Sequence, residues 1–177
     1  MARLKDEYAS RIVPELEKKL GTTNRMLVPR LQKIVLNMAF GIVSKDEQKS
    51  LVDDLAALSG QRPMLCRAKK SISNFKLREG MVIGAKVTLR GERMWEFADR
   101  LISSALPRIR DFRGVPNRGF DRAANYTLGV TDHTIFPEVA ESAAHSGMDI
   151  TFVTSTTDIK AAKELLSSMG MPFAGRN

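Results

Sequence analysis

The side chains of this sequence that could take part in chemistry are cationic and amide groups concentrated in the middle of the chain. The net charge is +8, and residues 61–122 hold 15 Lys and Arg against 6 Asp and Glu. A localised block of positive charge attracts a polyanion, because each neutralised phosphate releases condensed counterions. The competing interpretation is a basic surface that only confers solubility, but that role does not require the charge to sit in one third of the chain.

The first dense part of this block is a basic segment followed by a loop at about 73–82. In the loop, Lys76 and Arg78 are expected to contact RNA. Phe75 could stack on a base, but its residue type favours packing of the loop base against the core. The candidate RNA-binding residues of the basic segment are Gln61, Arg62, Arg67, Lys69, Lys70 and Ser71.

The second dense part is an arginine-rich stretch at about 106–123. Its prolines and glycines exclude a regular helix or strand and predict an exposed, partly ordered loop. Arginine presents a planar guanidinium that suits phosphate, guanine or carboxylate, so RNA and a protein partner both remain open as targets. The candidate residues are Arg108, Arg110, Arg113 and Arg118.

These groups need elements that position them, and the alternation of apolar and polar residues predicts strands for that purpose. Residues 33–38 place Lys33 and Asn37 on one side, and residues 83–90 place Lys86, Thr88 and Arg90 in a row on one face. Outward residues of a strand lie roughly 6–7 Å apart, comparable to the spacing of phosphates. Two further alternating runs, residues 126–131 and 148–152, predict two more strands.

Helical periodicity appears between these strands. The expected helices cover residues 3–20, 44–59, 92–105 and about 158–169, with Pro14 interrupting the first and Thr157 as N-cap of the last. The residues of the last helix expected in the core are Ile159, Ala162, Leu165, Leu166 and Met169. Ser44 and Glu47 form a capping-box pattern. Strands with one apolar face imply an α+β fold, a mostly antiparallel sheet with helices on one face and a polar basic face exposed. We expect a single domain over residues 1–177.

Catalytic and metal-binding patterns are nearly absent. The chain has two histidines and one cysteine, Cys66, so it lacks a Cys/His zinc set, and it has no phosphate-binding glycine loop. His133 is expected on the surface or in a turn, and Asp53 and Asp54 as solvated helix charges. We therefore predict no enzyme activity, no cofactor and no metal. No membrane span or signal peptide is expected, so the protein should be cytoplasmic.

Several segments, in order along almost the whole chain, resemble those of the bacterial large-subunit ribosomal protein numbered five, a universal family that binds 5S rRNA. Together they are highly specific, although none is a short motif by itself. They are residues 33–38, 60–63, 68–72, 75–80, 84–91, 106–114 and 135–138. In this chain Arg122-Ala123-Ala124 stands where the family carries a glycine-containing run, so the turn before Asn125 is expected to differ.

The resemblance implies a structural role in the central protuberance of the large subunit. It implies contacts with 5S rRNA, 23S rRNA, P-site tRNA, neighbouring 5S-binding ribosomal proteins, and a small-subunit head protein across an intersubunit bridge. The 5S-facing motifs contain Asn37, Gln61, Arg62, Lys69, Lys70, Ser71, Thr88 and Arg90, to which Lys33, Arg67 and Lys86 are added from the basic surface. The tRNA-facing loop contains Asn74, Phe75, Lys76 and Arg78, and the loop near the bridge contains Arg108, Arg110, Arg113 and Arg118.

Two other classes of protein are compatible with a basic sheet face. One is a non-ribosomal RNA-binding module or RNA chaperone, which would not need the arginine-rich loop. The other is a basic RNA-modifying enzyme, which would need a nucleophile or cofactor site that the sequence does not display. The ordered set of family segments favours the ribosomal role over both.

Overall fold

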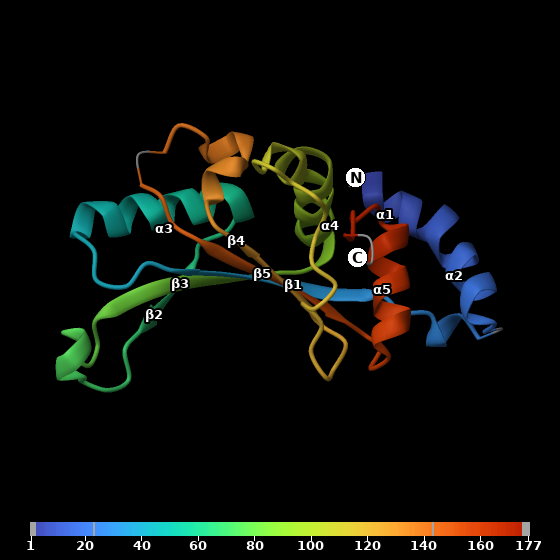
Figure 1. The fold of residues 1–177 in the computed structure, drawn as a ribbon, viewed down its shortest axis with the longest axis horizontal. Helices are drawn as coiled ribbons and strands as arrows, with labels where there is room; N and C mark the ends of the chain where they lie inside the picture. The colour runs from blue at the N-terminus through green and yellow to red at the C-terminus, as the bar shows by residue number, and fades with distance from the viewer. Residues whose placement is uncertain (1–2, 23, 143, 175–177) are drawn as a thin grey trace. The chain divides into compact units, whose positions relative to one another are not determined.

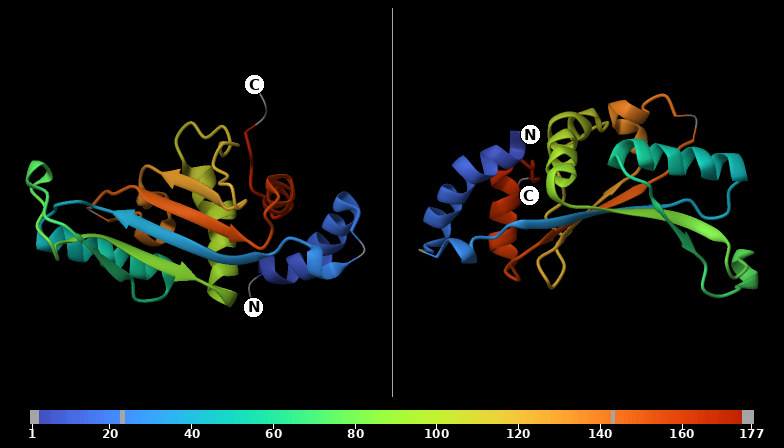
Figure 2. Two further views of the ribbon diagram at one scale, coloured as in Figure 1. Left: turned by 90° about the horizontal axis from the view of Figure 1, so that it is seen from below. Right: turned by 180° about the vertical axis from the view of Figure 1, so that it is seen from behind.

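The structure is a computed structural model that describes residues 3–22, 24–142 and 144–174. Five strands form one sheet in the order β2-β3-β1-β5-β4, and neighbouring strands run in opposite directions (Figure 2). The predicted α+β class is confirmed. The strands are β1 (Leu31–Ala39), β2 (Met64–Arg67), β3 (Val82–Leu89), β4 (Tyr126–Val130) and β5 (Met148–Thr154).

Strand β2 was not among the strands predicted from sequence. Three of its four residues are exposed and the fourth is half-buried, so the strand has no buried face to leave an alternating pattern. It is a strand because it pairs with β3 in an antiparallel ladder, Met64 opposite Lys86 and Cys66 opposite Gly84. Pairing partners distant in sequence, rather than local periodicity, determine this strand.

The chain forms two compact units, which we describe in turn. Unit 1 comprises Met1–Ile34, Leu89–Leu128 and Thr151–Asn177, and unit 2 comprises Val35–Thr88 and Gly129–Ile150. That residues 1–177 act as one RNA-binding domain stays a prediction.

The helix of unit 2 is α3 (Lys45–Ser59), which begins one residue after the predicted start and ends at the predicted residue. The Ser44 side chain accepts from the Glu47 N–H, and the Glu47 carboxylate accepts from the Ser44 N–H, which completes the capping box. Gly60 ends the helix with φ of +63°, a backbone conformation that glycine adopts without strain.

Helix α3 lies on one side of the unit 2 strands (Figure 1). The buried residues of the helix and of strands β1 and β3 are Leu51, Leu55, Leu58, Leu36, Met38, Ala85 and Val87. The alternate strand residues, including Asn37, Lys86 and Thr88, are half-buried or exposed. The strands of unit 2 therefore have the apolar face and the polar face that the sequence predicts.

His133, expected on the surface or in a turn, lies in the short helix η6 (His133–Ile135) but is fully buried. Its Nε2 is 3.2 Å from the Asp54 carboxylate, and its Nδ1 is 3.1 Å from the Ser146 carbonyl oxygen. The Ser142 hydroxyl donates to the same Asp54 oxygen at 2.6 Å. The prediction of a surface position for His133 and of a solvated Asp54 was therefore wrong. These bonds fasten α3 to the segment that contains the short helix η7 (Pro137–Val139).

The helices of unit 1 include two wide, π-helical segments, each ending two residues before a proline. The first helical region is α1 (Arg3–Glu7), η1 (Tyr8–Ile12) and α2 (Val13–Leu20), and the second is α4 (Gly91–Arg100), η4 (Leu101–Ala105) and η5 (Leu106–Arg108). The segments η1 and η4 are the wide ones, before Pro14 and Pro107. Proline lacks an N–H and its ring collides with the carbonyl four residues back, so a wider turn accommodates it.

Both π-helical segments carry a serine four residues before the proline. Ser10 donates to the carbonyl of Asp6 at 2.8 Å, and Ser103 donates to the carbonyl of Asp99 at 2.6 Å. The two helical regions also contact each other, since Arg3 forms an ion pair with Asp99 at 2.6 Å. The irregular helix predicted around Pro14 is therefore confirmed, and a second π-helical segment with a bonded serine precedes Pro107.

The last helix of unit 1 is α5 (Ile159–Ser168), and its start differs from the prediction by one residue. Asp158, not Thr157, is the N-cap, because its carboxylate accepts the Lys160 N–H at 2.9 Å. Ile159 was expected inside but is 45% exposed, since it is the first residue of the helix. The predicted core residues Ala162, Leu165, Leu166 and Met169 are buried.

Candidate nucleic-acid interface

The basic segment and the first predicted loop form one continuous hairpin in unit 2. Beyond β2, the N–H of Ala68 donates to the Met81 carbonyl at 2.8 Å, and the N–H of Gly80 donates to the Ala68 carbonyl at 3.0 Å. An isolated bridge between Ile72 and Leu77 continues the pairing to the tip. Figure 1 shows this tip extending beyond the start of β3. The two basic stretches therefore lie on opposite arms of one projection.

A single turn of 3₁₀ helix, η3 (Ser73–Phe75), closes the tip. Lys76 follows it in a left-handed conformation with φ of 53°, and its N–H donates to the Ser73 carbonyl. Phe75 is 68% exposed. The expectation that Phe75 packs the loop base against the core was therefore wrong, and an aromatic ring is presented to solvent beside Asn74 and Lys76, both of which are exposed.

The cationic side chains of the hairpin are exposed and unpaired with carboxylates among the described residues. Glu79 is the one acid between residues 61 and 88. In unit 1, by contrast, Arg3, Arg11 and Lys19 each form an ion pair with an acid. Cations without a protein counter-ion are available for phosphate. The exposed cations of this hairpin surface are Arg62, Arg67, Lys69, Lys70, Lys76, Arg78 and Lys86.

Two polar residues from separate motifs meet at the base of the hairpin. The Gln61 side-chain amide donates to the backbone carbonyl of Thr88 at 2.9 Å, which fixes Gln61 against β3. Arg62 follows Gln61 and is exposed. At the other arm, the Ser71 hydroxyl accepts the Glu79 N–H at 2.9 Å. The structure thus brings Gln61 and Thr88 together, and holds Ser71 against the opposite arm.

Other predicted residues lie in unit 1. Lys33 is half-buried near the start of β1, whereas Asn37, in the same strand, belongs to unit 2. Arg90 is exposed directly after β3, at the N-cap of α4. The arginine-rich stretch is also in unit 1, and its candidates Arg108, Arg110, Arg113 and Arg118 are all exposed.

The arginine-rich loop is anchored by residues near the C-terminal end of the described chain. The Val115 N–H donates to the Pro172 carbonyl at 2.8 Å, and the Ala174 N–H donates to the Val115 carbonyl at 2.9 Å. The Asn117 amide donates to the Ala174 carbonyl at 2.8 Å. The stretch is therefore ordered at its centre, with arginines on either side of a fixed point.

Aromatic packing holds the end of the same loop. Tyr126 is fully buried, its hydroxyl donates to the Pro116 carbonyl at 2.8 Å, and burial raises the pKa of Tyr126 to about 12. Its ring lies 4.8 Å from the Phe120 ring and 5.4 Å from the Phe173 ring, measured between centroids. Buried aromatic contacts of this kind keep a loop in one conformation without regular secondary structure.

Among the described residues, no group of three or more His, Cys, Asp or Glu could hold a metal ion. Ser142 and His133 both bond to the same Asp54 oxygen. In a catalytic triad the histidine contacts the serine hydroxyl, so this arrangement does not activate Ser142 as a nucleophile. None of the helices in the described ranges is long and apolar enough to cross a membrane.

One cationic surface was missed in the sequence. Arg25 and Arg30 flank the exposed residues Met26 and Leu27 in unit 1, around the 3₁₀ turn η2 (Arg25–Leu27). The available signal was an apolar pair between two arginines, next to Pro29 and outside any periodic element. Because the surrounding residues 1–60 are nearly balanced in charge, the regional charge count did not reveal it.

Comparison with known proteins gives a consistent result over nearly the whole chain. The family model described as "Ribosomal protein L5" matches residues 24–78, and a second model, which describes the C-terminus of the same ribosomal family, matches residues 82–173. A protein of Acidobacterium capsulatum is 54% identical over 176 residues, covering 97% of each chain. A protein of Rubrobacter xylanophilus is 53% identical over 177 residues, covering 98% of each chain.

A third relative, from Alkaliphilus oremlandii, is 52% identical over 179 residues, covering 98% of this chain and 99% of its own. All three relatives carry the name "Large ribosomal subunit protein uL5". This agrees with the resemblance inferred from the sequence segments and with the prediction that the protein is not an enzyme. The chain belongs to the ribosomal protein L5 family, whose members are structural, non-enzymatic proteins of the large ribosomal subunit in the cytoplasm.

Proposed function

We propose that this protein binds 5S rRNA through the hairpin surface and the polar face of unit 2, and helps to attach that RNA to the large subunit. The observation that carries the proposal is the set of seven exposed cations between residues 61 and 88 that pair with no carboxylate in the described part of the chain. Phosphates would supply the missing counter-charges, and their neutralisation would release counterions from the RNA.

The polar groups beside these cations suit the other parts of a nucleotide. Asn37 and Thr88 offer an amide and a hydroxyl from neighbouring strands, and Gln61 is fixed against Thr88. Such groups can accept from and donate to 2′-hydroxyls and base edges in an irregular RNA region. Lys33 and Arg90 are assigned to the same RNA because their motifs belong to the 5S-facing set of the family resemblance. The specificity would come mainly from RNA shape.

The hairpin tip is proposed to contact P-site tRNA. Phe75 is 68% exposed and is flanked by Asn74 and Lys76, with Arg78 on the returning arm. An exposed ring beside cations can stack on a nucleotide while the cations hold its phosphate. Its role would be positional, because stacking of the ring and contacts of the cations with phosphate hold a tRNA without a chemical step.

The arginine-rich loop is proposed to contact 23S rRNA or a small-subunit head protein across an intersubunit bridge. Its anchoring at Val115 holds exposed arginines on both sides, and Arg110 pairs with its neighbour Asp111 only at 3.8 Å. Neighbouring 5S-binding ribosomal proteins are the remaining proposed partners.

The experiment is equilibrium binding of the purified protein to 5S rRNA over a range of salt concentrations, with tRNA and an unrelated structured RNA as competitors. Lys70→Ala and Arg90→Ala are each expected to weaken binding and to lower the salt slope by somewhat under one, because one lost phosphate contact changes it by about 0.9. Lys160→Ala is the matched control, since Lys160 is an exposed cation on α5, outside the proposed surface.

Binding that survives excess competitor RNA, with slopes lowered only in the first two variants, would support the assignment. Salt slopes that stay unchanged in both variants would remove Lys70 and Arg90 from the interface. Weak binding that every competitor abolishes equally would reduce the hairpin surface to a general polyanion site, as expected of an RNA chaperone.

A further inference from the structure

The turn η2 in unit 1 exposes two large apolar side chains between two arginines. Met26 is 82% exposed and Leu27 is 66% exposed. The turn is held firmly on both sides, because the Asn24 side chain accepts the Met26 N–H at 2.9 Å and Val28 is buried. The exposure of Met26 and Leu27 is therefore a fixed feature of the fold, and adjacent exposed apolar side chains of this size commonly mark a contact surface.

The chain beyond the turn is also fixed. The Tyr8 hydroxyl donates to the Pro29 carbonyl at 3.1 Å. Arg30 exchanges two bonds with Ser155, since its N–H donates to the Ser155 hydroxyl and its carbonyl accepts the Ser155 N–H, both at 3.0 Å. These two bonds involve only the backbone of Arg30, so its guanidinium takes no part in them.

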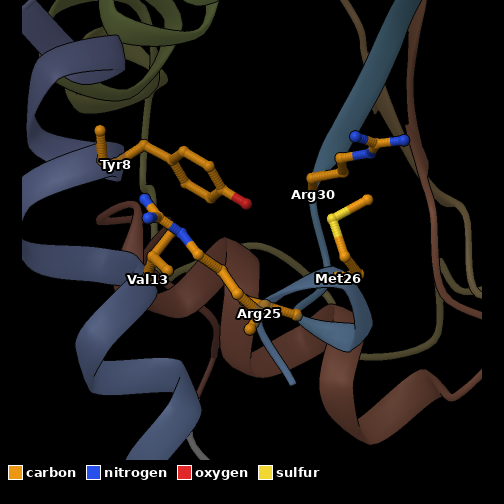
Figure 3. Close-up of a pocket in the computed structure, with 7 residues that line it drawn as sticks. Tyr8, Val13, Arg25, Met26 and Arg30 are labelled. Carbon is orange, nitrogen blue, oxygen red and sulfur yellow. The ribbon is translucent and has the colours of Figure 1, made fainter. Parts of the chain in front are cut away.

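Two hollows adjoin the turn and share Met26 and Arg30 as lining residues. The first has a volume of about 230 Å³ and is also lined by Tyr8, Ala9, Val13, Arg25 and Val28 (Figure 3). The second has a volume of about 400 Å³ and is also lined by Leu27, Gln32, Ser155, Thr156 and Thr157. In Figure 3 the hydroxyl of Tyr8 points toward the space between Arg25 and Arg30.

The lining residues include two guanidiniums and no carboxylate. Burial raises the pKa of the Tyr8 hydroxyl, and the positive charges of Arg30 and Arg25 oppose that rise, so both guanidiniums act on this space. Neither arginine side chain pairs with an acid in the described ranges, unlike Arg3 and Arg11 of the same unit. An anion would complete the charge balance here.

The remaining groups match a nucleotide better than a free anion. Met26 and Leu27 offer apolar area on which a base can lie, and Tyr8 lines the same hollow as Met26. The hydroxyls and the amide of the second hollow suit a ribose or a base edge. Paired bases are already stacked, so this surface suits an unpaired stretch of RNA.

We propose that the η2 surface (Tyr8, Arg25, Met26, Leu27, Arg30, Gln32 and Ser155–Thr157) is a second RNA-binding site, one that takes unpaired nucleotides. Arg25 and Arg30 each hold one phosphate, from neighbouring nucleotides, and a base covers Met26 and Leu27. This site uses none of the residues assigned to 5S rRNA, tRNA or the bridge. A test of this site can therefore fail or succeed independently of the proposed function.

The test uses the full chain and a single-stranded oligoadenylate of about eight nucleotides as probe. The double variant Arg25→Gln/Arg30→Gln removes two exposed charges, and Lys18→Gln/Lys160→Gln removes two exposed charges elsewhere in unit 1. Affinity is measured over salt, and the methyl resonance of Met26 is followed in protein with ¹³C-labelled methionine methyls. A Met26→Ser variant assigns that resonance among the nine methionines.

We expect a saturable shift of the Met26 resonance in the wild type and in the lysine control. The arginine variant should lose the shift, and the salt slope should fall by about 1.4, since each single-strand phosphate contact contributes about 0.7. Inorganic polyphosphate should bind without the ring-current shift that a base produces. Two results would overturn the proposal and favour a protein partner for Met26 and Leu27. One is a Met26 chemical shift that does not change at saturating oligoadenylate, and the other is an equal salt slope in the two double variants.

Discussion

Replacement of Tyr126 by Phe tests how firmly the arginine-rich loop is held. The change removes the hydroxyl that donates to the Pro116 carbonyl at 2.8 Å and leaves the buried ring in place. Pro116 is exposed, so its carbonyl can be rehydrated in the variant. We therefore expect the free energy of unfolding at pH 7 to fall by about 1 kcal/mol, the net value of one ordinary hydrogen bond.

The same variant should change how stability depends on alkaline pH. Burial raises the pKa of Tyr126 from 10.0 to about 12 in the folded protein. The stabilising contribution of the Tyr126 hydroxyl is fully present below pH 10, where both the folded and the unfolded protein keep its proton. It is lost as pH rises toward 12, because the hydroxyl ionises at lower pH in the unfolded chain than in the folded protein. The loss is of the order of 3 kcal/mol, since each pKa unit corresponds to about 1.4 kcal/mol.

Urea unfolding between pH 7 and 11.5, followed by the fluorescence of Trp95, measures both effects. The wild type should lose stability above pH 10 more steeply than Tyr126→Phe, so that its advantage of about 1 kcal/mol disappears at about pH 11 and the two curves cross. Tyr8→Phe is the matched control, because the Tyr8 hydroxyl also donates to a proline carbonyl and burial also raises its pKa, but it does not contact the loop. Parallel curves for the wild type and Tyr126→Phe would refute the reasoning.

Two further substitutions test the packing of unit 2, each in urea unfolding at neutral pH. Gly84→Ala should destabilise by roughly 1–3 kcal/mol, because the new methyl would lie 2.8 Å from the Met38 carbonyl oxygen, whereas Gly129→Ala meets no atom closer than 3.6 Å and should be nearly neutral. His133→Ala should cost about 1–3 kcal/mol by leaving buried polar groups without their partner, and the exposed His145→Ala should cost under about 0.5 kcal/mol. Equal losses in either pair would contradict the assigned contacts.

The elements with local signals were predicted closely. Helix α3 lies within one residue of its expected range because Ser44, Glu47 and Gly60 determine its ends through contacts a few residues apart. Strand β3 was also found, since its alternation reflects one buried and one open face. The cations of the hairpin surface were identified for the same reason, because a charge needs no tertiary contact to be recognised.

Features that depend on distant partners could not be predicted in this way. Strand β2 exists because β3 pairs with it, and His133 is buried because Asp54, 79 residues away, supplies a partner. Ala124 adopts a left-handed φ of 58°, held by the Asp121 carbonyl on one side and the Thr154 hydroxyl on the other. An alanine gives no local signal for that conformation, which ordinarily favours glycine.

The anchoring of the arginine-rich loop also sets an order of events during synthesis. Val115 and Asn117 emerge early, but their partners Pro172 and Ala174 follow only at the far end of the described chain, with 57 residues separating Asn117 from Ala174. A chain that folds as it is made will therefore expose these arginines in an unfastened loop for some time. Anions in the cell can reach these arginines during that interval. How long the arginines stay accessible therefore depends on how quickly the last residues of the described chain are synthesised.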